Sequence, residues 1–560
     1  MIDPPAVPAW AWGDRMWPWE SDVLRDAPEV ALFLCLALGF ALGRIRFRGV
    51  AVGGVAGTLA AALAVGLLAG GVTVHPQVRV IAFAVFAFTF GYTLGPAFFA
   101  AFAGPNLRYV WFTVIEVVRA LAVAALVADV LGLDPATTAG LVAGAAAGPV
   151  ALGTSADALQ AAGIGSAQGA LGPAYVLSYL FALVTIALLT SRAAPAVLRF
   201  DPAEAAAALW RRLDGEEETP PPAVLGRAHQ VTTGEGRTVA QAEIAMGTRV
   251  SVERLRRNGR PIAFGPDTLL ERDDEAVVVG VRQDVVNACA VIGPEVPGGR
   301  ELDLDLEVAD VMLAGRPPAT VRALRAGLSG QGVQDLHVCE VTRVGCRLPV
   351  RPGTPLHAGD VVRVTGIKRD VDRAAAWLGA RADAGRRADV VYLSAGLVAG
   401  LVAGLAGGLT VSVGCLLAGL VFGRVRAGRA RFGQYDAGAA RVVGELALGV
   451  FVAALGLSAG PAAVELVGRH GWQVALGAVA AAAMPVVISL AMAAKLMMLP
   501  PPLVLGAVTG QHGLTAILGA VRRMSGNGTP LLAYTVVHAL SGAVLALLGP
   551  AAVALARWVG

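Results

Sequence analysis

Charged residues are scarce in this chain: Asp, Glu, Lys and Arg make up 15% of 560 residues, whereas 56% are hydrophobic. Average soluble chains are about one-quarter charged, so the composition excludes an ordinary soluble enzyme and a disordered scaffold. The chain has five cysteines without a CxxC pair, which excludes a disulfide-stabilised secreted module. A net charge of +4 over this length gives no indication of nucleic-acid binding. The composition predicts a polytopic membrane protein, mostly helical.

The few charges are unevenly distributed. Of the 41 acidic residues, 27 lie between Asp201 and Asp383, and the flanking regions are runs of Ala, Val, Leu and Gly. This pattern predicts a membrane half, a water-soluble centre and a second membrane half. The predicted units are an extracytoplasmic segment (1–28), membrane repeat 1 (29–192), a linker (193–221), two soluble modules (222–293 and 305–380) and membrane repeat 2 (389–556).

Each membrane half contains six apolar segments of about the length needed to cross a bilayer. They are 29–47, 50–71, 79–101, 109–132, 136–156 and 172–191, then 390–408, 410–424, 441–459, 472–497, 502–520 and 531–555. The fifth of each half is rich in glycine and carries polar groups. Irregular backbone at membrane depth is tolerated only where protein or a water-filled cavity surrounds it. We therefore expect two re-entrant hairpins, with about five true spans in each half.

Basic residues predict the orientation. With the N-terminus outside, Arg44, Arg46 and Arg48 and most other membrane-half arginines fall in inside loops, together with the centre. Five crossings per half then place both termini outside, the modules in the cytoplasm and the halves in inverted topology. A bacterial plasma membrane is the expected location.

The membrane halves also repeat in sequence. Residues 88–97 align with 453–462 at an offset of 365, and Gly140 and Gly144 align with Gly506 and Gly510 at an offset of 366. Ala174-Tyr175 likewise aligns with Ala533-Tyr534 at an offset of 359. Three such matches in the same order predict two inverted repeats.

The soluble centre repeats as well, at an offset of 86: the strand starting at Val250 corresponds to the one starting at Leu336. Alternating strands followed by a short helix predict two α+β modules. Neither contains GxGxxG after a strand, so a dinucleotide-binding unit is not expected. The segments GRPIAFGPDTLLERDDEAVVVGVRQDV and GCRLPVRPGTPLHAGDVVRVTGIKRDV resemble the TrkA-C regulatory module. That resemblance implies either a small regulatory ligand or dimerisation, and a homodimer is expected.

Four glycine-rich interruptions predict the solute site: GYTLGP (91–96), GLSAGP (456–461), GPVALGTSAD (148–157) and TGQHGLTAILG (509–519). A broken helix presents unpaired N–H groups and a positive dipole end to a cavity. Close helix packing is the alternative explanation for the two GxxxGP motifs. The predicted solute-binding residues are Gly91, Tyr92, Gly95, Pro96, Glu116, Arg119, Gly148, Pro149, Gly153, Thr154, Ser155, Asp157, Tyr175, Gly456, Ser458, Gly460, Pro461, Gln511, His512 and Tyr534.

Glu116 and Arg119 are ionisable residues inside an apolar segment, which suggests function by default. Their i,i+3 spacing lets them pair on one helix, so a self-neutralised structural pair is equally possible. No cluster has metal-ligand spacing and no nucleophile–base arrangement lies in a plausible context. We expect no metal, no cofactor, no catalytic residue and no enzymatic activity.

The whole chain resembles the aspartate:alanine exchanger family, through FTFGYTLGPAFFAAF, AGAAAGPVALGTSADAL, LGPAYVLSYLFAL, VFVAALGLSAGPAAVEL and GTPLLAYTVVHAL. This resemblance implies an alternating-access antiporter for an amino acid or small carboxylate. The second hairpin lacks the expected Thr-Ser-rich form, and His538 stands where the first half has Tyr179. The alternatives are a TrkA-C-regulated cation, proton or divalent-anion transporter, and a membrane sensor that moves no solute.

Overall fold

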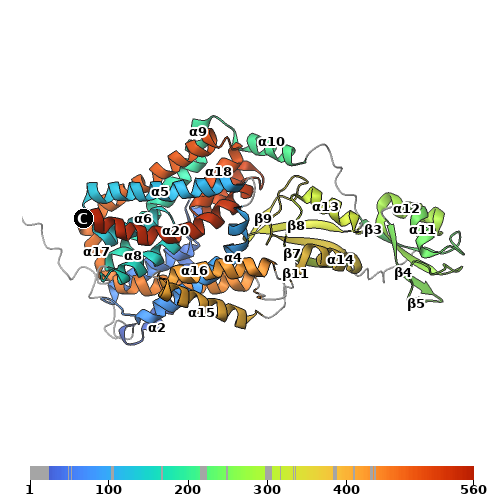
Figure 1. Ribbon diagram of the computed structural model, residues 1–560, viewed down its shortest axis with the longest axis horizontal. Coiled ribbons are helices and arrows are strands. Elements are labelled where there is room, and N and C mark those ends of the chain that lie inside the picture. Colours follow the sequence, from blue (N-terminus) through green and yellow to red (C-terminus); the bar gives the residue numbers. More distant parts are fainter. Residues whose placement is uncertain are drawn as a thin grey trace, which may run out of the picture.

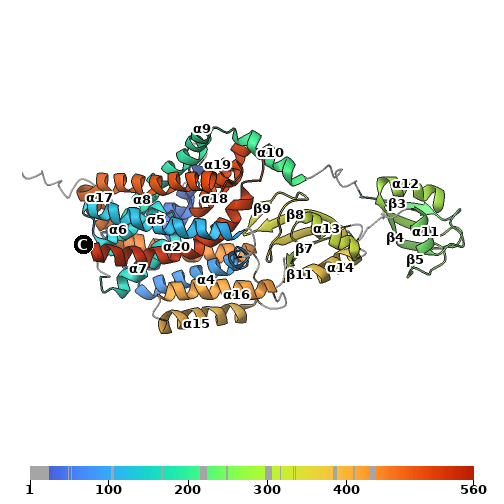
Figure 2. The same ribbon diagram turned by 45° about the horizontal axis from the view of Figure 1, so that its top comes forward.

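The computed structural model describes residues 24–559, apart from 48–49, 52, 103–105, 165–167, 215–223, 247–249, 297–305, 316, 332, 334–335, 383–387, 408–409, 429–432, 434 and 436. The segment predicted at 1–28 therefore lies almost wholly outside the described residues. Helices form one end of the molecule and two small sheets form the other, with the second soluble module between the helices and the first (Figures 1 and 2).

The described part of the first membrane half consists of helices joined by short connections, with one β1–β2 ribbon (Arg46–Phe47 and Val50–Ala51). Its helices are α2 (Pro28–Gly43), α3 (Gly54–Leu68), α4 (Pro76–Ala100), α5 (Leu107–Leu131), α6 (Pro135–Ala145), α7 (Pro149–Ala161) and α8 (Gln168–Leu188). A π-helical turn η3 (Leu189–Ala193) and α9 (Ala194–Leu198) follow, and α10 (Pro202–Asp214) occupies much of the predicted linker.

The second membrane half contains α15 (Val390–Ala406), α16 (Val411–Gly428), α17 (Ala437–Ala491), η4 (Met492–Leu496), α18 (Pro501–Gln511), α19 (Thr515–Ser525) and α20 (Leu531–Val559). The segment predicted at 441–459 lies in α17, and the one predicted at 472–497 begins in α17 and continues through η4, with no loop residue between the two segments. The C-terminus lies at the end of the bundle away from the modules (Figure 1).

Six helical segments among the described residues are long and apolar enough to cross a membrane: Pro76–Ala100, Gly169–Leu198, Val411–Gly428, Gly438–Gly468, Gly471–Leu496 and Leu531–Leu555. Three shorter apolar helices, α2, α3 and α15, accompany them. The protein is therefore a multi-pass membrane protein, as the composition predicted.

Glycines bring the membrane helices into backbone contact. A Cβ at Gly91 or Gly95 of α4 would lie 2.4 or 2.3 Å from a carbonyl oxygen of α16. A Cβ at Gly460 of α17 would likewise lie 2.2 Å from the backbone nitrogen of Leu67 in α3. Both α4 and α17 continue as helices through Pro96 and Pro461. The interruptions expected at the two GxxxGP motifs are therefore absent, and these glycines pack helices together.

Two pairs of short helices interrupt the bundle. Hairpin 1 comprises α6 and α7, and hairpin 2 comprises α18 and α19. Both limbs of hairpin 2 contact α10, on the module side of the bundle. The second limb of hairpin 1 instead reaches the first turns of α4 and α16, where Asp157 accepts a hydrogen bond from Ser412. Hairpin 2 thus opens toward the modules, and α7 runs toward the opposite face.

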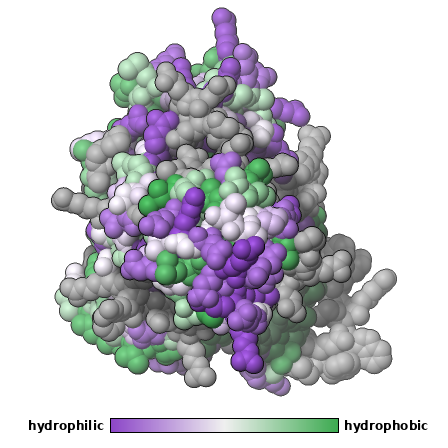
Figure 3. Space-filling model, turned by 90° about the vertical axis from the view of Figure 1, so that its right-hand side faces the viewer, coloured by the Kyte–Doolittle hydropathy of each residue, from purple (hydrophilic) through white to green (hydrophobic). Residues whose placement is uncertain are grey.

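The soluble centre consists of two antiparallel sheets with helices on them. Module 1 has sheet order β3-β6-β4-β5: β3 (Val224–Gln230), α11 (Val239–Met246), β4 (Val250–Arg257), β5 (Arg260–Ile262), β6 (Glu275–Val281) and α12 (Arg282–Val291). Module 2 has sheet order β11-β7-β10-β8-β9: β7 (Leu306–Leu313), α13 (Val321–Gly330), β8 (His337–Arg343), β9 (Cys346–Leu348), β10 (Val361–Ile367), α14 (Lys368–Leu378) and β11 (Gly379–Arg381). From the module end, hydrophilic residues cover much of the described surface (Figure 3).

Candidate functional site

The breaks in the two hairpins meet inside the bundle. Ala146–Gly148 separates α6 from α7, and His512–Leu514 separates α18 from α19. Ala147 and Gly513 have left-handed backbones, with φ of 53° and 60°. These two residues lie 366 positions apart, the same separation as Pro135 and Pro501, which begin the hairpins.

Two adjoining cavities lie at the tips. The larger, about 100 Å³, is lined by both tips together with α4 and α20: Phe90, Ala147, Gly148, Pro149, Val150, His512, Gly513, His538, Ser541, Gly542 and Leu545. The smaller, about 20 Å³, is lined by Glu116, Ala120, Val142, Ala145, Ala146, Ala481, Pro485, Gln511, His512 and Leu545. Because His512 and Leu545 line both, we treat them as one site, the tip cavity.

An ion pair reaches the tip cavity from α5. The Arg119 guanidinium donates to Glu116 Oε2, and Ser489 of α17 bridges the pair. The Ser489 hydroxyl donates to Glu116 Oε2 at 2.7 Å and accepts from Arg119 Nη2 at 2.7 Å. Glu116 is 7% exposed, and Arg119 Nη1 is buried without a hydrogen-bond partner among the described residues. The pair is neutral overall but retains one free donor.

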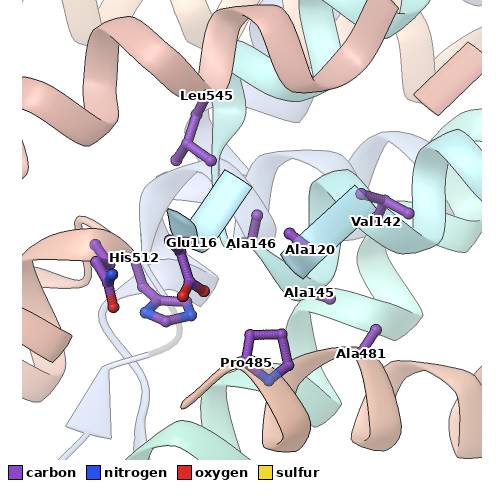
Figure 4. Close-up of a pocket in the computed structure, with 10 residues that line it drawn as sticks. Glu116, Ala120, Val142, Ala145, Ala146, Ala481, Pro485, His512 and Leu545 are labelled. Atoms are coloured by element: carbon purple, nitrogen blue, oxygen red, sulfur yellow. The ribbon is translucent and has the colours of Figure 1, made fainter. Parts of the chain in front are cut away.

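Gln511 and His512 enter the cavity from the end of α18. Gln511 is 2% exposed, and neither its Oε1 nor its Nε2 has a partner within the described part of the chain. His512 Nδ1 lies 3.1 Å from the carbonyl oxygen of Val508. Glu116 reaches into this space from α5 and His512 from the break after α18, with Pro485 and Ala481 across it (Figure 4). A buried amide with both ends unpaired is costly unless a ligand or water completes it.

The wall formed by α20 carries His538. Its ring stacks on Tyr534, with centroids 5.4 Å apart, and meets Phe90 edge-on at 6.2 Å. Ser541 Oγ donates to the carbonyl oxygen of Gly510 at 2.9 Å and so fixes α20 against the end of α18. The arrangement offers a small solute polar groups in an otherwise apolar cavity.

Five predicted residues line the tip cavity: Glu116, Gly148, Pro149, Gln511 and His512. Arg119 joins them through Glu116. The GxxxGP residues Gly91, Gly95, Gly456 and Gly460 pack against neighbouring helices, and Pro96 and Pro461 lie in the helices beside them.

The remaining predicted residues also lie elsewhere. Thr154, Ser155 and Ser458 donate to carbonyl oxygens of their own helices, and Gly153 packs on the Phe83 ring. Asp157 lies at the far end of hairpin 1 with Ser412 and Arg79. The hydroxyl of Tyr92 donates to the carbonyl oxygen of Gly433, while Tyr175 and Tyr534 are buried beside Tyr179 and His538.

Sequence reasoning did not select Ser489, Pro485 or His538 for the site. Ser489 is 370 residues from Arg119 and stands in an apolar run without any distinguishing motif. Pro485, inside the same span, was an available signal because proline in a membrane helix often borders a cavity. Among the described residues, no group of three His, Cys, Asp or Glu side chains could hold a metal ion.

Discontinuous helices whose ends meet at a buried polar cavity, inside a multi-pass bundle, are characteristic of membrane transporters. The chain belongs to the Asp-Al_Ex family, described as a predicted permease membrane region, whose model matches residues 31–193 and 389–554. The match covers both membrane halves and leaves out the two modules.

Relatives extend over nearly the whole chain. An uncharacterized transporter of Bradyrhizobium diazoefficiens is 31% identical over 558 residues, which are 95% of this chain and 98% of that protein. Uncharacterized transporters of Zymomonas mobilis (28% over 559 residues; 95% and 98%) and Bordetella parapertussis (31% over 573 residues; 96% and 98%) are similar in extent. No solved structure matches the chain.

Proposed function

We propose that the protein is a secondary active transporter that exchanges small amino acids or carboxylates through the tip cavity by alternating access. The observation that carries this proposal is the meeting of two helix breaks at one cavity lined by buried, incompletely paired polar groups. Such breaks are the usual location of a transporter's solute site.

The charges around the cavity fit a zwitterion or a carboxylate. The N–H groups at the start of α7 are donors for a carboxylate, since no side chain caps the start of that helix, and Arg119 adds a positive charge behind Glu116. Glu116 Oε atoms and Gln511 Oε1 are acceptors for an ammonium group. At about 100 and 20 Å³ the two cavities hold several waters and about one water, respectively. In this structure the site is therefore closed down to a volume that holds only a few water molecules beside its polar groups.

We further propose that the membrane halves are inverted repeats. The hairpin glycines support this: Gly140 and Gly144 contact carbonyl oxygens of Leu171 and Tyr175, whereas Gly506 and Gly510 contact those of Pro530 and Tyr534. The glycines are offset by 366 and their partners by 359, so one packing arrangement occurs twice. With the basic loops inside, both termini lie outside a bacterial plasma membrane and the TrkA-C-like modules lie in the cytoplasm. There a small ligand or a second copy of the chain could act on the modules.

Counterflow of labelled aspartate or alanine into proteoliposomes tests the proposal. Removing Arg119 alone would leave Glu116 buried and unpaired, which costs several kcal/mol, so we use the neutral pair Glu116→Gln with Arg119→Gln. This double variant should fold and lose counterflow at least ten-fold. Arg441→Gln with Glu445→Gln, which neutralises an exposed i,i+4 pair, is the matched control and should keep full activity.

The outcomes separate the alternatives. Full counterflow in the Glu116/Arg119 variant would make that pair structural and remove it from the site. Flux that requires a cation would favour the cation-coupled transporter. Silence of the unmodified protein with a panel of amino acids, carboxylates and divalent anions would favour the sensor.

A further inference from the structure

Module 2 is seated directly on the membrane bundle. Its hydrophobic core is continuous with Leu518 of α19 and with Leu531 and Tyr534 of α20. Gly359 lies against Pro96 at the end of α4, where a Cβ would come within 2.2 Å of the Pro96 Cβ. Gly353 N donates to the carbonyl oxygen of Leu213 in α10 at 2.7 Å. Four elements outside the modules, α4, α10, α19 and α20, therefore contact this module.

The turn between β8 and β9 also contacts the bundle. Its first residue, Val344, packs in the cluster formed by Leu94 and Ala97 of α4, Leu420 of α16 and Ala539 of α20. The turn therefore touches these three helices through Val344, which is half-buried, while Gly345 beside it is exposed.

Module 1 contains the same turn in a different setting. In each module an arginine at the end of the strand makes a bidentate pair with an aspartate: Arg257 with Asp274 and Arg343 with Asp360, both offset by 86. The Arg257 side chain is 27% exposed, whereas that of Arg343 is 2% exposed. The two modules thus share a construction, and in module 2 the first residue of this turn packs on the bundle.

The first residue of the turn differs between the two modules. Both turns have two successive left-handed residues: φ is 52° and 73° at Asn258–Gly259, and 50° and 71° at Val344–Gly345. Asn-Gly is the favoured sequence for this hairpin turn. A β-branched valine is disfavoured at positive φ. Module 2 therefore has a strained residue, Val344, where module 1 has the unstrained Asn258. Such strain is maintained where the side chain has a use, and the contact that Val344 makes is with the bundle.

This turn and the tip cavity share a neighbour on α4. Phe90 lines the cavity and belongs to the cluster that holds Val344. On α20, Tyr534 packs in the core of module 2, and its ring stacks on His538, which lines the cavity one turn further along. Val344 therefore packs on α4 and α20 next to the residues of these helices that line the cavity.

We propose that the β8–β9 turn of module 2 is a plug that closes the module-side exit of the tip cavity, and that it withdraws each time solute passes on that side. The inference rests on the proposed transport function, but it assigns the gate to a soluble module and not to the membrane helices alone. Anything that binds module 2 then controls transport by holding or releasing the plug.

The first test is Val344→Asn, which gives module 2 the turn sequence of module 1. Because Asn relaxes the backbone, the variant should fold, while it loses the apolar contact with the bundle. Alkylation of Cys346, half-buried on β9, should rise at least five-fold relative to the exposed Cys339 on β8. The reverse change in module 1, Asn258→Val, is the control and should leave this ratio unchanged. An unchanged ratio in Val344→Asn would overturn the plug.

The second test fixes the plug in place. In a cysteine-free background, Val344→Cys and Ala539→Cys are joined by a short reducible cross-linker, and counterflow in proteoliposomes should fall at least ten-fold and recover on reduction. Thr342→Cys with Arg347→Cys, partners across the same hairpin, ties the turn only to itself and should not affect counterflow. Full counterflow in the joined Val344–Ala539 protein overturns the plug but leaves the transport function standing. Absence of counterflow before cross-linking would count against the transport function, and the Cys346 ratio would still decide on the plug.

Discussion

At the scale of single residues, Ser489 connects two helices through the ion pair of the tip cavity. Its hydroxyl accepts from Arg119 and donates to Glu116, both at 2.7 Å, and it is fully buried. Hydrogen bonds to charged partners are stronger than those between neutral groups. Ser489 therefore holds α17 against α5 beside the cavity.

We expect Ser489→Ala to lower the free energy of unfolding by about 1 to 2 kcal/mol and to weaken solute binding, since both charged partners lose a hydrogen bond. Ser458→Ala is the control because its hydroxyl donates only to carbonyl oxygens of its own helix, and it should change stability by less than about 0.5 kcal/mol. Thermal unfolding in detergent and counterflow measure the two effects. Equal losses in both variants would contradict the bridging role of Ser489.

The sequence predicted the ion pair in this contact but not the serine that bridges it. Glu116 and Arg119 could be paired in advance because i,i+3 spacing places them on the same face of a helix, and the structure confirms the pair. Ser489 could not be predicted, since nothing local distinguishes it from other serines in apolar runs. Contacts between distant segments depend on how helices pack, and alanine-rich sequence leaves that packing open.

At the scale of elements, hairpin 2 depends on glycines that let α18 approach α20. A Cβ at Gly506 would lie 2.0 Å from the carbonyl oxygen of Pro530, so α18 would have to move. The repeated glycines predicted a re-entrant hairpin at 140–158 and another at 506–520, and the structure contains a helix break within each of these segments. The two GxxxGP motifs were wrongly predicted to interrupt their helices. Glycine also allows close helix packing, and that is what the glycines of these motifs do.

Gly506→Ala should reduce counterflow at least ten-fold and lower thermal stability, because the backbones of α18 and α20 are forced apart beside the cavity. Gly468→Ala, also within a helix but with nothing within 4 Å of its added Cβ, is the matched control. It should be neutral, or stabilise by up to about 1 kcal/mol, since alanine favours helix more than glycine does. Normal transport by Gly506→Ala would show that the close approach is not needed.

At the scale of the whole molecule, the seating of module 2 involves a titratable residue. His357 Nε2 lies 3.1 Å from Asn106 Nδ2, in the α4–α5 connection, and an amide N–H can donate only to an unprotonated ring nitrogen. Burial, helped by the nearby Arg343 guanidinium, lowers the pKa of His357 to about 4, although Asp360 acts in the opposite direction. The sequence could show the repeat of the two modules, but not that one of them is covered by the bundle.

This seating should therefore weaken in acid. If undocking returns His357 to an ordinary pKa near 6.5, its contribution is complete above that pH and is lost as the pH falls toward 4. Lowering the pH from 7.5 to 5.5 should shift the docking equilibrium toward the undocked state by about ten-fold, seen as a rise in the alkylation of Cys346 relative to Cys339. His357→Asn cannot be protonated in this range, so its ratio should stay constant. A pH response that persists in His357→Asn would place the titrating group elsewhere, and a ratio that falls in acid would reverse the sign required by a histidine whose pKa is lowered on docking.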